Sequence, residues 1–258
     1  MKKPSAFTHF DDILKKIEGK KLLFFLDYDG TLTPIVSHPK DAHLPLETKQ
    51  TLKSLSKNFF VAIVTGRGLE DIQSLIGIDN GIAFAASHGF LLQMADAKPF
   101  IYPDALSYQN EIEKAYRYLC DELGHIPGIY IENKLLSVAV HDRQVEKGLE
   151  VIKKKIEEAQ HLFSQLKLTH GKRVHELRPN LDWDKGKAVC WLIDAIPDVH
   201  TVLPIMIGDD LTDEDAFVAL KDKGITISVQ EAPKETHAEY TLKDSGEVVQ
   251  FLNKFLQI

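Results

Sequence analysis

The sequence predicts an α/β fold: a Rossmann-like core built on a parallel sheet and interrupted by an inserted α+β domain. Short apolar runs of strand length alternate with amphipathic helical patterns over residues 8–86 and again from residue 185 onward, which is typical of βαβ units. Between these stretches the pattern changes to two successive α-β-β units. We therefore expect a discontinuous core, residues 1–103 and 182–258, with residues 104–181 as the insertion.

The first half of the core begins with a short amphipathic helix over residues 8–18, where Phe10, Ile13 and Ile17 recur at helical spacing. Residues 22–26 are five consecutive apolar residues. Because this run is too short for a buried helix, it predicts a strand covered on both faces. After a loop marked by prolines, the elements expected next are a helix at 46–56, a strand at 59–64, a helix at 69–76 and a strand at 82–86.

The insertion is expected to form one sheet with two helices on one of its faces. Its predicted elements are helices at 112–123 and 145–163 and strands at 129–132, 135–141, 166–170 and 173–177. The core then resumes with a helix at 186–195, a strand at 203–207, a helix at 212–221, a strand at 225–228 and a C-terminal helix ending near residue 255. Thr212 is the expected N-cap of its helix, with Asp215 in an acidic first turn.

Composition limits the class of protein. The 258 residues are 44% hydrophobic and 27% charged, as is ordinary for a soluble globular protein. The net charge of −7 argues against general nucleic-acid binding. Neither a signal-peptide core nor a membrane-spanning run is visible, so we expect a cytoplasmic protein without a membrane partner. We also expect a monomer. Cys120 and Cys190 lie in apolar helical patterns and are expected to be buried thiols.

Two carboxylates, Asp27 and Asp29, follow the first strand directly, and Gly30 then allows a sharp turn close to a ligand. In open α/β sheets, ligands bind beyond the carboxyl ends of the strands. An EF-hand calcium loop starting at Asp27 is excluded, because the positions that need Gly and Glu are Leu32 and His38. Taken alone, the pattern is equally compatible with a polar turn that has no function.

Further polar residues follow other elements of the expected core: Thr65, Lys185 and the pair Asp209 and Asp213. Each has an ordinary explanation in isolation, as a turn, a solvated helix start or an acidic first turn. The stretch from Gly66 to Asp71 fails as a dinucleotide fingerprint, because Asp71 occupies the third glycine position. Occurring together at one edge of a parallel sheet, however, these residues are improbable by chance.

Two acidic clusters that converge at one edge would repel each other unless a cation lay between them. Oxygen ligands without cysteine or clustered histidine favour Mg²⁺. A hydroxyl from Thr65 and the charge of Lys185 suit phosphoryl oxygens. This combination predicts phosphoryl transfer through an aspartyl-phosphate.

These residues resemble the four motifs of the haloacid dehalogenase superfamily, which read here as residues 27–31, 65–67, 185–186 and 208–213. The resemblance implies that the insertion is a C2-type cap. It also implies that Asp27 is the nucleophile and that Asp29 is a general acid and then a base. The ion-pumping ATPases of that superfamily carry Thr at the position of Asp29 and keep a long-lived phosphoenzyme, so an Asp here predicts rapid turnover.

The same resemblance implies the phosphate and metal sites. Thr65 and Lys185 would hold the phosphoryl group. The residues implied to bind Mg²⁺ are Asp27, Asp29 through its carbonyl, and Asp209, with Asp213 supporting the ion through water or neighbours.

The insertion is expected to determine substrate specificity, because Ser137, His141 and Arg143 share one side of a predicted strand. Mixed Glu, Lys and Arg on an open sheet face suit a polyhydroxylated ligand, although the pattern alone slightly favours a solvated face with incidental charges. Segments 132–134, 141–143, 176–179 and 184–188 resemble the trehalose-6-phosphate phosphatases. The substrate-binding residues that the resemblances imply are Gly66, Arg67, His88, Glu132, Lys134, His141, Arg143, Glu176 and Arg178.

The resulting hypothesis is a Mg²⁺-dependent phosphatase that converts trehalose 6-phosphate to trehalose. One alternative keeps the chemistry but changes the substrate to sucrose 6-phosphate or a glycosyl phosphoglycerate. The other is a non-catalytic sugar-phosphate binding module, against which Asp29 and Asp209 argue, because a binder needs no acid/base pair and no complete metal site.

Overall fold

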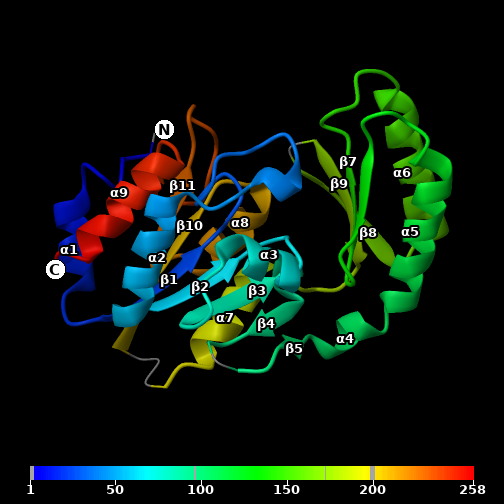
Figure 1. Cartoon of the computed structure of the whole chain (residues 1–258). Helices are drawn as coiled ribbons and strands as arrows, with labels where there is room; N and C mark the ends of the chain where they lie inside the picture. Colours follow the sequence, from blue (N-terminus) through cyan, green and yellow to red (C-terminus); the bar gives the residue numbers. More distant parts are fainter. Residues whose placement is uncertain (1–2, 96, 172, 198–200) are drawn as a thin grey trace. The chain divides into compact units, whose positions relative to one another are not determined.

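The computed structural model of the chain describes residues 3–95, 97–171, 173–197 and 201–258 (Figure 1). The chain divides into two compact units, Met1–Phe100 with Trp183–Ile258, and Ile101–Asp182. No helix among the described residues is both long and apolar enough to cross a bilayer.

Among its described residues, the first unit contains an eight-stranded sheet with the strand order β12-β11-β10-β1-β2-β3-β4-β5. Neighbouring strands from β12 through β3 are parallel, whereas β4 is antiparallel to β3. The predicted α/β class is therefore confirmed, with an antiparallel edge. The strands are β1 (Lys21–Leu26), β2 (Phe60–Val64), β3 (Ile82–Ala86), β4 (Leu91–Gln93), β5 (Phe100–Ile101), β10 (Val202–Gly208), β11 (Ile225–Val229) and β12 (Tyr240–Leu242).

Helices cover both faces of this sheet. Successive residues of a strand point to opposite sides, so the contacts of neighbouring residues in β1 show what lies on each face. Leu23 and Phe25 belong to a buried cluster that includes residues of α7 and α8. Phe24 faces the other way. Its ring packs edge-on against that of Phe255 on α9, with the ring centres 5.1 Å apart. The helices are α1 (Phe10–Ile17), α2 (Leu46–Asn58), α3 (Leu69–Ile76), α7 (Lys185–Asp194), α8 (Leu211–Ala219) and α9 (Ser245–Phe255), with 3-10 turns at Pro39–Asp41 and Ser87–Gly89.

The second unit is a four-stranded antiparallel sheet in the order β6-β7-β9-β8. Its helices α5 and α6 lie on the same side of the sheet (Figure 1). Leu119 and Ile156 from these helices share one buried cluster with Val140 and Leu177 from the strands. The elements are α4 (Pro103–Leu106), α5 (Gln109–Leu123), β6 (Tyr130–Asn133), β7 (Val138–His141), α6 (Leu149–Leu162), β8 (Leu166–Gly171) and β9 (Val174–Pro179).

Several local expectations are wrong. The N-cap of α8 is Asp210 and not Thr212, because Asp210, two residues earlier, forms a reciprocal capping box with Asp213. The strand expected at 135–141 begins only at Val138, because Leu135 has a φ of 67° in the preceding turn. Cys120 and Cys190 are free thiols, as expected, but they are half-buried rather than buried.

Four short elements were not predicted, namely α4, β4, β5 and β12. They contain two to four residues each, which is too few to show a period in the sequence.

Candidate active site

The site is built where β1 and β10 lie side by side. The two strands pair in parallel from Lys21 with Val202 to Leu26 with Ile207, and the Asp27 amide donates to the Ile207 carbonyl at 2.9 Å. The chain continues from β1 to β2 on one side and from β10 to β11 on the other. Ligands bind at such a topological switch point in open α/β sheets.

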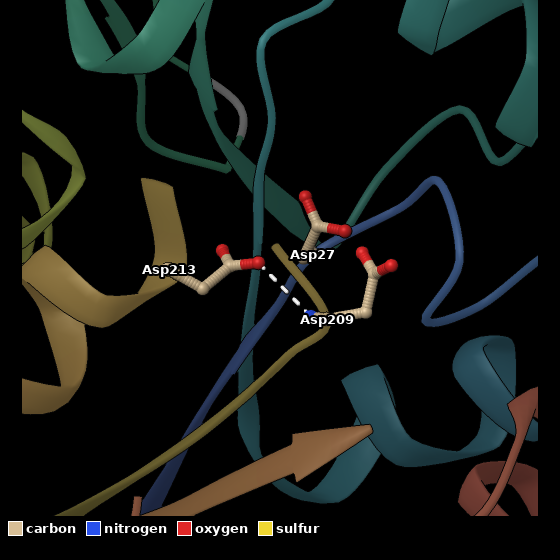
Figure 2. Close-up of side chains that lie close together, drawn as sticks. All are labelled: Asp27, Asp209 and Asp213. Atoms are coloured by element: carbon tan, nitrogen blue, oxygen red, sulfur yellow. Dashed lines mark hydrogen bonds between the residues drawn. The ribbon is translucent and has the colours of Figure 1, made fainter. Parts of the chain in front are cut away.

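Three buried carboxylates meet there: Asp27 after β1, Asp209 after β10 and Asp213 on α8 (Figure 2). They can each offer an oxygen within 4.8 Å of the others. Oδ2 of Asp213 accepts hydrogen bonds from the amides of Asp209 and Asp210, both at 3.0 Å. Burial raises the pKa of Asp27 well above its ordinary value; Lys185 opposes this rise, while Asp213 and Asp209 add to it.

Lys185 supplies the positive charge of the cluster from the first turn of α7. Its Nζ donates to Oδ1 of Asp27 at 2.9 Å and to Oδ1 of Asp213 at 2.7 Å, and its side chain is only 3% exposed. Burial alone would lower the pKa of Lys185, but Asp213 and Asp27 outweigh burial and raise it. One ammonium against three carboxylates leaves excess negative charge, which suits a divalent cation.

Two glycines let the carboxylates approach this closely. A Cβ on Gly30, whose φ is 88°, would lie 2.4 Å from Oδ2 of Asp209. A Cβ on Gly208 would lie 2.3 Å from Cγ of Asp213. Side chains at these positions would displace the oxygens of the candidate metal site.

Asp29 is held by Arg67 through a two-pronged ion pair. Nε of Arg67 donates to Oδ2 of Asp29 at 2.6 Å, and Nη2 donates to Oδ1 at 2.8 Å. Arg67 also donates to Asp71 at 2.7 Å and to the Pro39 carbonyl at 2.9 Å, and its guanidinium lies 5.5 Å from the centre of the Tyr28 ring. Arg67 thus positions Asp29, a contact that sequence reasoning missed when it placed Arg67 on the substrate.

Thr65 and His88 lie in two turns that touch each other. Thr65 is buried, and its hydroxyl accepts from the Arg67 amide at 3.2 Å, while its carbonyl accepts from the His88 amide at 2.9 Å. A Cβ on Gly66 would lie 2.6 Å from Cε1 of His88. His88 is itself buried and has a φ of 56°, a strained conformation that is often found at functional sites.

Two further contacts around the site left no sequence signal. The indole of Trp183 donates to the Gly89 carbonyl at 2.8 Å and so fixes the turn that carries His88. The ammonium of Lys234 donates to the main-chain carbonyl of Asp209.

In the second unit, the predicted sugar-binding residues form two groups on the sheet face opposite α5 and α6. Oε1 of Glu176 accepts from Ser137 Oγ at 2.6 Å and from Lys134 Nζ at 3.3 Å. Nε2 of His141 lies 3.2 Å from Oε2 of Glu132.

Both glutamates of these groups are register partners of Ala139, so a small residue separates them. Arg178 is buried on β9. The sequence pattern placed Arg143 on the same strand as His141. In the structure, Arg143 instead lies in a turn after the end of β7.

The fold of the chain is that of the haloacid dehalogenase-like hydrolases. A haloacid dehalogenase-like hydrolase from B. subtilis shares this fold, with a TM-score of 0.57 at 14% identity over 90% of this chain and 99% of that one. The trehalose-phosphatase family profile matches residues 25–246, and the chain belongs to that family.

Relatives and solved structures agree. The probable trehalose-phosphate phosphatase I of Arabidopsis thaliana is 37% identical over 100% of this chain and 73% of its own length. The trehalose 6-phosphate phosphatase RA3 of Zea mays is 36% identical over 98% and 74%. A trehalose-6-phosphate phosphatase related protein has a TM-score of 0.80 at 28% identity, covering 91% of this chain and 97% of that one.

Proposed function

We propose that the protein is a Mg²⁺-dependent phosphatase that hydrolyses trehalose 6-phosphate to trehalose and phosphate through an aspartyl-phosphate on Asp27. The observation that carries this proposal is the position of Asp27, which is buried, held by Lys185 and adjacent to Asp209 and Asp213. Membership of the trehalose-phosphatase family supports the substrate.

The donor set fits Mg²⁺, because it offers buried carboxylate oxygens and excess negative charge. Asp27 and Asp209 would hold the ion together with the main-chain carbonyl of Asp29. Both oxygens of Asp213 already accept hydrogen bonds, so Asp213 would act through its neighbours. A bound Mg²⁺ would neutralise charge on the transferring phosphoryl group.

The chain's own residues divide the chemistry. A carboxylate oxygen of Asp27 attacks phosphorus, and the departing sugar oxygen takes its proton from Asp29. Asp29 then takes a proton from water, which attacks the aspartyl-phosphate, releases phosphate and restores Asp27. The Thr65 hydroxyl and the Lys185 ammonium hold phosphoryl oxygens. Gly66, Arg67 and His88 shape the turns around the phosphoryl group.

The second unit recognises the sugar and acts as the cap of the enzyme. We assign Glu132, Lys134 and Glu176 to the distal glucose, since carboxylates accept from sugar hydroxyls and cations donate to them. His141 orients Glu132, and Arg143 and Arg178 position the substrate. We also infer a monomer in the cytoplasm without a nucleic-acid or membrane partner; sedimentation of the purified protein tests the monomer.

Replacing Arg67 by Lys is expected to lower kcat about 10- to 100-fold, because Lys keeps the charge but cannot grip both oxygens of Asp29. KM for the sugar phosphate should change little if Arg67 acts on Asp29. Steady-state kinetics separate the two constants. A rise in KM alone would instead place Arg67 on the substrate. The matched variant Asp71→Ala removes one partner of Arg67 but leaves its two hydrogen bonds to Asp29, so it should have the smaller effect.

Phosphate release from a panel of sugar phosphates tests the substrate. We expect the highest kcat/KM for trehalose 6-phosphate, loss of activity with a chelator and recovery with Mg²⁺. Equal or higher kcat/KM for sucrose 6-phosphate or a glycosyl phosphoglycerate would transfer the assignment to that substrate. No phosphate release from any of them would favour the non-catalytic binding module.

A further inference from the structure

A pair of histidines lies in the second unit, away from the residues assigned above. His170 of β8 and His175 of β9 are direct register partners in an antiparallel pair. Their Nδ1 atoms are 2.8 Å apart, with ring centres 5.0 Å apart and ring planes at 85°. His170 is exposed, so one member of the pair is open to solvent.

This pair lies on the helix-covered face of the sheet and not on the proposed sugar face. His175 lies two residues before Leu177 on β9, so both side chains point to the same face of the sheet. Leu177 belongs to the buried cluster beneath α5 and α6. Glu176, between them, points to the opposite face. The pair therefore does not belong to the sugar-recognition groups.

A buried carboxylate fixes the proton on His175. Nε2 of His175 lies 3.2 Å from Oδ2 of Asp142, which is 3% exposed. Nε2 therefore carries the hydrogen and donates it, and in a neutral ring Nδ1 then accepts the hydrogen bond that Nδ1 of His170 donates. The other oxygen of Asp142 lies 3.0 Å from Nε of Arg173. Asp142 is thus held between Arg173 and the side of the His175 ring that faces away from His170.

We propose that His170 and His175 chelate a divalent transition-metal ion through their Nδ1 atoms, with the hydrogen that lies between them moving to Nε2 of His170. Two imidazole nitrogens that each lie about 2.05 Å from an ion and subtend a right angle at it, as in square-planar or octahedral coordination, are about 2.9 Å apart, close to the separation found here. The carboxylate on the far nitrogen of His175 is the usual outer support of a metal-binding histidine. Water would complete the coordination on the exposed side.

The ligand chemistry separates this site from the acidic cluster of the first unit. Imidazole nitrogen favours Ni²⁺, Cu²⁺ and Zn²⁺, whereas carboxylate oxygen favours Mg²⁺. A bound ion would link β8 to β9 and so stabilise the folded second unit, because it binds the paired histidines of the folded state more tightly than the separated ones of the unfolded chain. Among the described residues, Asp142 contacts His175 and also forms an ion pair with Arg173.

Titration of the full chain with Ni²⁺ by calorimetry, in the presence of saturating Mg²⁺, tests the proposal. We expect one more Ni²⁺ bound by the wild type than by His170→Ala, and a rise in melting temperature with Ni²⁺ that His170→Ala lacks. Asp142→Asn should bind about 10- to 100-fold more weakly, because His175 loses its support. Cu²⁺ bound to the wild type should show nitrogen coupling in its paramagnetic resonance spectrum.

The matched control is His161→Ala, which removes another exposed histidine of the same unit, on α6, and should leave the extra site intact. His170 is exposed on an edge strand, so its removal should not prevent folding. Equal Ni²⁺ stoichiometry and affinity in the wild type and His170→Ala would overturn the proposal. Absence of any Ni²⁺ binding by the wild type would also overturn it and leave only a hydrogen-bonded pair.

Discussion

Replacing Asp27 by Asn is expected to abolish phosphate release while leaving the fold intact. The amide cannot attack phosphorus, so the fall in kcat should be on the order of 10⁴-fold or more. Its oxygen can still accept the hydrogen bond that Lys185 now donates to the carboxylate at 2.9 Å. Phosphate release from trehalose 6-phosphate measures the activity, and circular dichroism checks the fold. Turnover near the wild-type rate would refute the nucleophile assignment.

The same variant makes a prediction about stability. Burial raises the pKa of Asp27, so the folded state binds its proton more tightly than the unfolded state does. Without a divalent ion, this carboxyl therefore destabilises the fold as pH rises from the ordinary range of Asp through its raised pKa. With a chelator at neutral pH, Asp27→Asn should melt no lower than the wild type.

Asp29→Asn is the matched control for the effect on stability. This variant should also lose activity. Asp29 lies outside the buried carboxylate cluster, and the substitution removes the negative charge that pairs with Arg67, so the variant should gain no stability. A lower melting temperature for Asp27→Asn than for the wild type in chelator would contradict the repulsion inferred for the cluster.

The fold class and the meeting of the acidic residues follow from patterns that the sequence displays. The apolar run before Asp27 has the length of a buried strand, and the alternation with helices makes the sheet parallel. Parallel strands end at one edge, so residues after β1 and β10 meet there wherever these strands are neighbours. Nothing in that reasoning requires knowledge of side-chain contacts.

The contacts that escaped prediction depend on distances across the fold. Arg67 contacts Asp29 from 38 residues away, and the choice between Asp29 and a substrate phosphate as its partner is made by tertiary geometry. The N-cap of α8 was misplaced because Asp210 and Thr212 are both good caps, and the reciprocal bond with Asp213 decides between them. Leu135 gave no turn signal, since apolar residues rarely adopt a positive φ.

Replacing Lys185 by Met should damage both stability and activity, because the ammonium is buried between two carboxylates. Removing one partner of a buried ion pair costs about 3–5 kcal/mol, since the remaining charges stay unneutralised. Loss of a charged donor aimed at the phosphoryl group should also lower kcat about 10²- to 10³-fold. Denaturant unfolding in chelator and steady-state kinetics with Mg²⁺ measure the two effects.

A double variant identifies the cause of the lost stability. If unneutralised charge is responsible, adding Asp27→Asn to Lys185→Met should recover part of the lost free energy of unfolding, with a coupling of about 1 kcal/mol or more. If the loss instead reflects poor packing of Met, the two changes should add, and the double variant should recover no more than Asp27→Asn gains in the wild type. Lys221→Met, which alters an exposed lysine after α8, should leave stability and activity nearly unchanged. A larger recovery of the free energy of unfolding than additivity allows would show that Lys185 stabilises the fold by balancing the acidic residues that the proposed chemistry requires.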